Sequence, residues 1–135
     1  MGLAAPGAMA LDAAFLADIQ RKGLEALGEA ICSEGEFCAP ATEAEFAEPP
    51  LDMEVADGIA TQAIYSAMAD NCGLDFANLT FLPMMRWMRG TGDFSQRQVA
   101  LAGLMHGITM GSVAGREELA CSERTRALLA SRGIE

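Results

Sequence analysis

The feature that most constrains the fold is a run of eighteen residues without a formal charge, from Gln98 to Gly115. At about 1.5 Å per residue, a helix over this run would be about 27 Å long, close to the thickness of the apolar layer of a membrane. The run contains polar side chains and several glycines, however, and no other segment is comparably apolar. A helix that is apolar on nearly all sides is more simply the buried centre of a helical domain, so we expect no membrane span.

A strong helix-start signal precedes this run. Ser95 and Gln98 are three residues apart, as the two members of a capping box are, and Phe94 and Val99 are placed to form a hydrophobic staple around it. The signal and the uncharged run together predict a buried central helix over residues 95–113. We therefore expect an all-α fold: a single compact domain of about five helices, orthogonal or bundle-like, around this central helix and stabilised by disulfides.

Apolar periodicity places the remaining helices at residues 11–33, 52–72, 76–89 and 116–131. The third is expected to break at Pro83, because proline lacks the N–H that a continuous helix uses. Residues 33–50 contain five glutamates and three prolines, and we expect an acidic loop there, with a short helical turn at 42–47. Phe37 and Phe46 are expected to dock this loop onto the helices.

The second of these helices has recognisable ends. Asp52 is a good N-cap residue, and Gly73 stands where a helix needs a left-handed residue just beyond its C-terminal end. Leu74 can make the apolar contact that accompanies such an end.

Length and composition favour one domain. The chain has 135 residues, of which 51% are apolar, enough for a core in a domain of ordinary size. We expect the domain to span residues 11–135. Residues 1–10 are interpreted as a flexible N-terminus or as the remnant of a signal peptide, because Ala8-Met9-Ala10 fits the small-x-small rule for signal cleavage.

The four cysteines, Cys32, Cys38, Cys72 and Cys121, favour two disulfides, because an even count in a small chain is typical of exported proteins. Of the three connectivities we favour Cys32–Cys38 with Cys72–Cys121. Free buried thiols are one alternative. Zinc is another, although structural zinc sites usually have closer cysteine pairs than the C-x5-C found here. The cysteines and the N-terminal segment together predict a periplasmic or secreted protein.

Charge is distributed unevenly along the chain. The net charge is −10; residues 1–80 hold 14 acidic and two basic residues, whereas residues 81–135 hold five acidic residues and seven arginines. Nucleic acids and anionic membranes need basic surfaces, so both are excluded as expected partners. The acidic half is either a solvated face or the contact surface for a basic protein partner.

Glycines recur every fourth residue on the central helix, at Gly103, Gly107, Gly111 and Gly115. Each interior glycine lowers helix stability by about 1 kcal/mol relative to alanine. Close approach of another helix can offset this loss, as it does where small residues line helix crossings. We expect the neighbouring helix to come from the same chain; the alternative is a homodimer through Gly103, Gly107 and Gly111.

His106 is the only histidine and lies on the central helix. Nothing in the sequence places a nucleophile and an orienting acid beside it, so we interpret it as a core or pocket-lining histidine with a hydrogen-bond partner. A soft-metal alternative remains: imidazole and thioether ligands suit Cu(I), and Met110 is one helical turn from His106.

The candidate binding residues are Arg86, Trp87, Arg89, Arg97 and His106. The three arginines bracket a turn at 90–93 near the only tryptophan, and guanidinium groups bind anions or acidic protein surfaces through paired hydrogen bonds. Alternatively, they pair with the carboxylates of the chain itself.

No catalytic, nucleotide-binding or cofactor-binding motif is present, and we expect no cofactor. The leading hypothesis is therefore a non-enzymatic, exported helical protein that acts by binding another protein, as an accessory subunit or inhibitor. The alternatives are a Cu(I)-binding protein that uses His106 and methionines, and a small enzyme with a site built from carboxylates and arginines.

Overall fold

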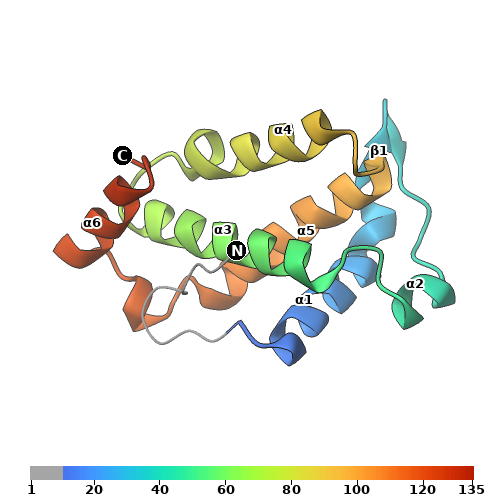
Figure 1. The fold of residues 1–135 in the computed structure, drawn as a ribbon, viewed down its shortest axis with the longest axis horizontal. Coiled ribbons are helices and arrows are strands. Elements are labelled where there is room, and N and C mark those ends of the chain that lie inside the picture. Colours follow the sequence, from blue (N-terminus) through green and yellow to red (C-terminus); the bar gives the residue numbers. More distant parts are fainter. Residues whose placement is uncertain (1–10) are drawn as a thin grey trace.

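The computed structural model describes residues 11–135; the interpretation of residues 1–10 as a flexible or signal-derived segment lies outside this range. The described chain is mostly helical (Figure 1). Its elements are, in order, α1 (Ala13–Ala26), η1 (Leu27–Glu29), β1 (Ile31–Ser33), β2 (Glu36–Phe37), α2 (Glu43–Ala47), α3 (Met53–Asn71), η2 (Ala77–Phe81), α4 (Leu82–Thr91), α5 (Gln96–Val113), η3 (Glu117–Leu119) and α6 (Glu123–Ser131). No helix among residues 11–135 combines the length and hydropathy needed to cross a membrane.

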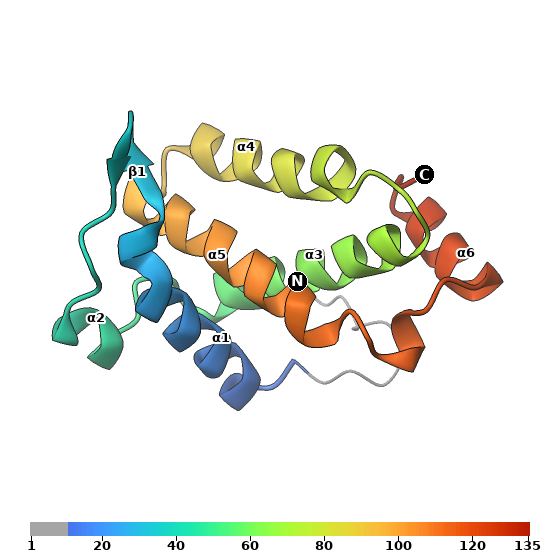
Figure 2. The same ribbon diagram turned by 180° about the vertical axis from the view of Figure 1, so that it is seen from behind.

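The predicted helix over residues 95–113 is confirmed as α5, although one face of it, with Gly107 and Gly111, is exposed. Its capping box is complete: the Ser95 hydroxyl accepts from the Gln98 N–H at 3.1 Å, and the Gln98 side chain accepts from the Ser95 N–H at 2.8 Å. α5 shares the centre of the fold with α3, against which it packs, while α1 and α4 lie on opposite sides of this pair (Figures 1 and 2).

α3 has the ends that the sequence predicts. The Asp52 carboxylate accepts from the Val55 N–H at 2.9 Å. At the other end Gly73 has a φ of +75°, and the Leu74 N–H donates to the Ala69 carbonyl at 2.9 Å. Most side chains between these ends are buried, because α3 is surrounded by α1, α5, α6 and the η2 segment.

The core has two parts, one at each end of the α3–α5 pair. The first joins α1, α4 and the N-terminal half of α5, and its fully buried side chains include Leu24, Leu27, Met88, Leu101 and Met105. The second joins the C-terminal halves of α3 and α5 to η3 and α6, through Ile64, Met68, Val113, Leu119 and Leu129. Alanine and methionine make up much of both parts, which allows the helices to pack closely.

The first helix is shorter than predicted. α1 ends at Ala26 rather than residue 33, and after η1 the chain forms an antiparallel hairpin of β1 and β2. Gly35, with a φ of +70°, occupies the turn. The predicted helical turn at 42–47 is confirmed as α2, whose N-cap Thr42 forms a capping box with Glu45. The predicted docking of Phe37 and Phe46 is wrong, because both rings are exposed.

Pro83 does not break the chain into two helices. The π-helical turn η2 leads directly into α4, and Pro83 lies in the first turn of α4, where a missing N–H is tolerated. α4 ends beyond Gly90, at Thr91, with Gly92 in the left-handed conformation. The predicted helix over residues 116–131 is interrupted, since η3 and a new N-cap at Ser122 precede α6.

The expected close packing of the glycines inside the chain is wrong for most of them. A Cβ atom at Gly107, Gly111 or Gly115 would have no heavy atom within 4 Å outside the local helix. At Gly103 it would lie 3.3 Å from Cε of Met85 on α4. Of these four glycines, only Gly103 therefore supports a helix contact within the chain. Gly107 and Gly111 lie on an open face of α5, and Gly115 follows the end of that helix.

We expect Gly107→Ala and Gly111→Ala each to raise the free energy of unfolding by about 0.5–1 kcal/mol, because alanine favours the helix and meets no neighbour. Gly103→Ala is the matched control and should give a smaller gain or a loss, because Met85 must move. Urea denaturation measures all three. A loss of stability at Gly107 and Gly111, together with a change from dimer to monomer in light scattering, would instead identify the homodimer interface.

Candidate functional site

Both disulfides join the cysteines favoured from the sequence, Cys32 with Cys38 and Cys72 with Cys121, and none of the four is free. Such bonds form and persist in oxidising compartments. The first closes the β1–β2 hairpin, and the second ties the end of α3 to the segment before α6. The described chain is therefore a disulfide-bonded helical domain.

Three of the candidate binding residues lie together on the outer surface of α4. Met85 and Met88 point into the core, which leaves Arg86, Trp87 and Arg89 exposed to solvent. Within residues 11–135, no carboxylate lies within 4.0 Å of either guanidinium group. This α4 surface, defined by Arg86, Trp87 and Arg89, thus presents two cations and one large apolar ring.

A groove of about 350 Å³ runs between α3 and α4 beside this surface. Val55 and Ile59 of α3 line one wall, and Met84 and Met88 of α4 line the other. The Trp87 ring, 62% exposed, lies at its rim and has Phe94 as an aromatic neighbour at 6.1 Å. The groove is mostly apolar, with Glu54 and Gln62 among its polar lining residues.

A second groove, of about 580 Å³, lies on the other side of α4, between that helix, β1 and α5. Arg89 and Gln96 contribute polar groups to it, and Ile31, Phe94 and Leu104 contribute apolar ones. Gly103 lies in its wall. α4 therefore separates two grooves, with Trp87 beside one and Phe94 beside the other.

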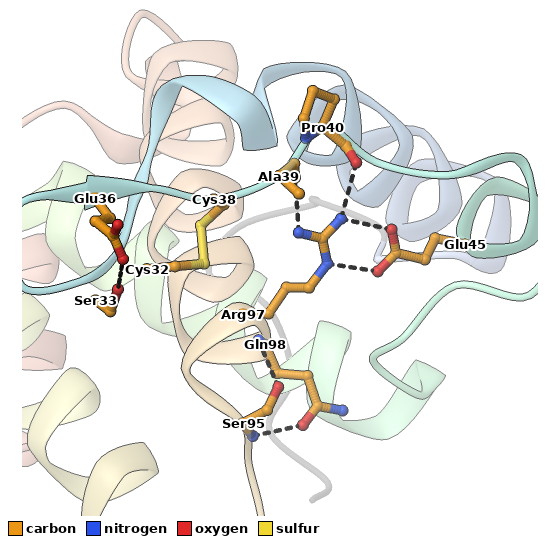
Figure 3. Close-up of a disulfide and its surroundings, with 10 residues drawn as sticks. All are labelled: Cys32, Ser33, Glu36, Cys38, Ala39, Pro40, Glu45, Ser95, Arg97 and Gln98. Atoms are coloured by element: carbon orange, nitrogen blue, oxygen red, sulfur yellow. Dashed lines mark hydrogen bonds and ion pairs between the residues drawn. A yellow bond between two sulfur atoms is a disulfide. The ribbon is translucent and has the colours of Figure 1, made fainter.

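Arg97 does not belong to this exposed group. Its guanidinium donates to both carboxylate oxygens of Glu45 at 2.7 Å and to the carbonyls of Ala39 and Pro40 at 2.7 and 3.1 Å (Figure 3). The Arg97 guanidinium, aided by the Thr42 N–H, lowers the pKa of Glu45 to about 2. Arg97 therefore pairs with a carboxylate of its own chain and fixes the segment before α2 to the start of α5.

His106 is 2% exposed and lies within a hydrogen-bond network between α3, α5 and η2. Its Nε2 is 2.8 Å from the Ser66 hydroxyl, which is 2.6 Å from the Thr80 hydroxyl; Thr80 donates to the Phe76 carbonyl at 2.7 Å. The Ser66 hydroxyl has one proton, which it can donate to Thr80 or to the Gln62 carbonyl at 3.0 Å; in both arrangements Nε2–H of His106 donates to Ser66. Burial lowers the pKa of the imidazole to about 4, so the ring is neutral near pH 7.

A serine hydroxyl at hydrogen-bond distance from a histidine resembles a nucleophile and its base. Here, however, Ser66 and His106 are both buried and neither lines either groove. Among the described side chains, no carboxylate hydrogen bonds to the imidazole. The network therefore fits the predicted core histidine with a hydrogen-bond partner.

The copper alternative gains no support from this arrangement. Nε2 of His106 is already hydrogen bonded to Ser66, and Met110 packs half-buried against the second part of the core. Within the part of the chain that the structure describes, no three His, Cys, Asp or Glu side chains gather in a group that could hold a metal ion.

The structure adds residues that sequence reasoning missed. Ser66 and Thr80 are far from His106 in sequence, and no spacing rule connects them. The hairpin that exposes Ile31 and Phe37 is also absent from the sequence-based predictions. Its signal in the sequence is the Glu34-Gly35 pair, because glycine is common in the turn of a hairpin.

Comparison with protein-family models, with curated proteins and with solved structures gives no match.

Proposed function

We propose that this chain is an exported protein-binding module, an accessory subunit or inhibitor that works in the periplasm or outside the cell. The two disulfides support the location, because bonds of this kind persist where thiols are oxidised. The α4 surface supports the binding function.

The exposed Trp87 beside an apolar groove is the observation that carries this proposal. Tryptophan, methionine and arginine are enriched at protein interfaces, and tryptophan and arginine dominate binding energy where they cluster. A large exposed ring at the rim of an apolar groove, on a helix whose two arginines have no ion-pair partner among residues 11–135, is suited to a protein contact. The partner would place an apolar side chain in the α3–α4 groove and carboxylates beside Arg86 and Arg89.

The experiment is site-specific photo-crosslinking in the native host. A photoreactive phenylalanine replaces Trp87 in one variant and the exposed Ala127 of α6 in the control. A partner that cross-links only from position 87 is then purified. We expect Trp87→Ala to weaken its binding at least tenfold, and Arg86→Glu with Arg89→Glu to do the same.

The matched charge control is Arg124→Glu with Arg126→Glu, because both arginines are exposed on α6, away from α4. This variant should bind the partner as the wild type does. Equal cross-linking from positions 87 and 127, or equal binding by all variants, would contradict the proposal.

A further inference from the structure

The β1–β2 hairpin presents a second apolar surface, distinct from the groove beside Trp87. Ile31 and Phe37 are paired across the two strands, and their side chains are 54% and 67% exposed. The Cys32–Cys38 disulfide links β1 to the residue that follows β2 (Figure 3). Two large apolar side chains are therefore held side by side in solvent on a cross-linked support.

Three carboxylates lie close to this apolar pair in sequence, and one of them, Glu36, accepts from the Ser33 hydroxyl at 3.2 Å. Glu29, Glu34 and Glu36 lie within the same short stretch of chain, and all three are exposed. The chain contains no lysine or arginine between Lys22 and Arg86. Arg97, which reaches the segment beyond the hairpin, is bound to Glu45. Among residues 11–135, no cation lies within 4.0 Å of the three carboxylates.

We propose that this hairpin surface, defined by Glu29, Ile31, Glu34, Glu36 and Phe37, docks a segment of another protein that carries aliphatic and basic side chains. The aliphatic side chains cover Ile31 and Phe37, and the basic ones pair with the carboxylates. Charge complementarity identifies the occupant, because the same carboxylates repel anionic membranes and a second hairpin. Because the disulfide already restricts the backbone of the hairpin, the hairpin loses little conformational entropy on binding.

The hairpin surface borders the α4 surface at one groove, which both Ile31 and Arg89 line. Trp87 lies beside the other groove, so a Trp87 variant separates the tests of the two surfaces. The probe is a short synthetic peptide of alternating leucine and lysine, labelled for fluorescence anisotropy. Its matched peptides replace leucine by serine, which keeps the charge, or lysine by glutamate, which keeps the apolar side chains. We expect the leucine–lysine peptide to bind at least tenfold more tightly than either.

The variants locate the contact. Phe37→Ser should weaken binding of the leucine–lysine peptide at least tenfold. Glu34→Gln with Glu36→Gln should weaken it and reduce its dependence on salt. Met53→Ser removes another exposed apolar side chain, 47% exposed at the start of α3, and should leave binding unchanged. Trp87→Ser should also leave it unchanged, which separates this surface from the α4 surface.

Equal binding of the leucine–lysine and serine–lysine peptides would overturn the proposal, because charge alone would then account for it. Equal binding by wild type and Phe37→Ser would overturn it as well. Light scattering of the wild type without peptide tests whether the surface binds a second copy of the chain. Self-association that Phe37→Ser abolishes would overturn the proposal, because the second copy would then be the occupant. Circular dichroism establishes that each variant retains its helices.

Discussion

Replacing Cys72 and Cys121 by serine is expected to lower the free energy of unfolding by about 4 kcal/mol. The two cysteines are 49 residues apart, and a cross-link over a loop of that length restricts the unfolded chain by about this amount in the entropy model. The loop contains η2, α4 and α5, and its closure fixes the segment that carries η3 and α6. Urea denaturation of the double variant measures the loss.

The matched control is the double serine variant of Cys32 and Cys38, which are only 6 residues apart. The same model assigns this short loop about 2 kcal/mol. An equal loss in the two variants, or a larger one for the hairpin disulfide, would contradict the loop-length argument. We also expect α6 to fray first in the Cys72/Cys121 variant, with faster hydrogen exchange, because only side-chain packing, as at Leu129, and the stacking of Arg132 on Tyr65 then hold it against α3.

Elements with local start and stop signals could be predicted from the sequence. Ser95 and Gln98 fix the start of α5 by hydrogen bonds within one turn, and Asp52 and Gly73 fix the two ends of α3 in the same way. These interactions connect residues at most a few positions apart. Their pattern is therefore visible in the sequence without knowledge of the tertiary fold.

Elements whose ends depend on distant contacts could not be predicted. α1 stops at Ala26 although its apolar pattern continues to Ile31, because the chain turns there to form the disulfide-closed hairpin. Beside that turn, Gly28 lies against Pro40, where a Cβ would be 3.3 Å from the proline ring. Pro83 was expected to end a helix, but the π-helical turn before it removes the clash that proline causes in a regular helix.

The glycine pattern was overinterpreted for a related reason. The sequence-based prediction requires a close helix contact within the chain to compensate for the low helix propensity of Gly107 and Gly111. The surrounding core, which buries Leu101, Met105 and Val113 on the opposite side of α5, stabilises the helix by packing instead. The helix propensity of these glycines contributes less to the stability of α5 than the burial of its apolar side chains does.

The binding role of the candidate residues stays a prediction. Arg86, Trp87 and Arg89 are all exposed on α4, with Trp87 beside one groove and Arg89 in the wall of the other. Sequence alone did not separate Arg97 from them, because its partner Glu45 is 52 residues away. The same limit applies to His106, whose partner Ser66 is 40 residues away on α3.

His106 gives the second large prediction: we expect the free energy of unfolding to fall by about 3 kcal/mol between pH 7 and pH 4. Burial lowers the pKa of the folded imidazole from its ordinary value of 6.5 to about 4. The unfolded chain therefore binds a proton first, and stability decreases as the pH falls through this interval. Below about pH 3 both states are protonated and this contribution no longer changes. The difference between the two pKa values corresponds to about 3 kcal/mol.

His106→Gln tests this assignment, because the glutamine amide can donate to Ser66 in place of Nε2–H but does not titrate. The variant should lose most of the stability change between pH 6.5 and pH 4 in urea denaturation. Glu45→Gln is the control. The pKa of Glu45 is about 2 against an ordinary 4.5, so its stabilisation begins to fall near pH 5 and most of it is lost between pH 4 and pH 2. Most of the slope from pH 6.5 to pH 4 should therefore persist in this variant. Proton NMR of the single histidine gives the direct measurement: an imidazole that titrates near 6.5 in the folded protein would refute the buried, neutral ring and the hydrogen-bond network assigned to it.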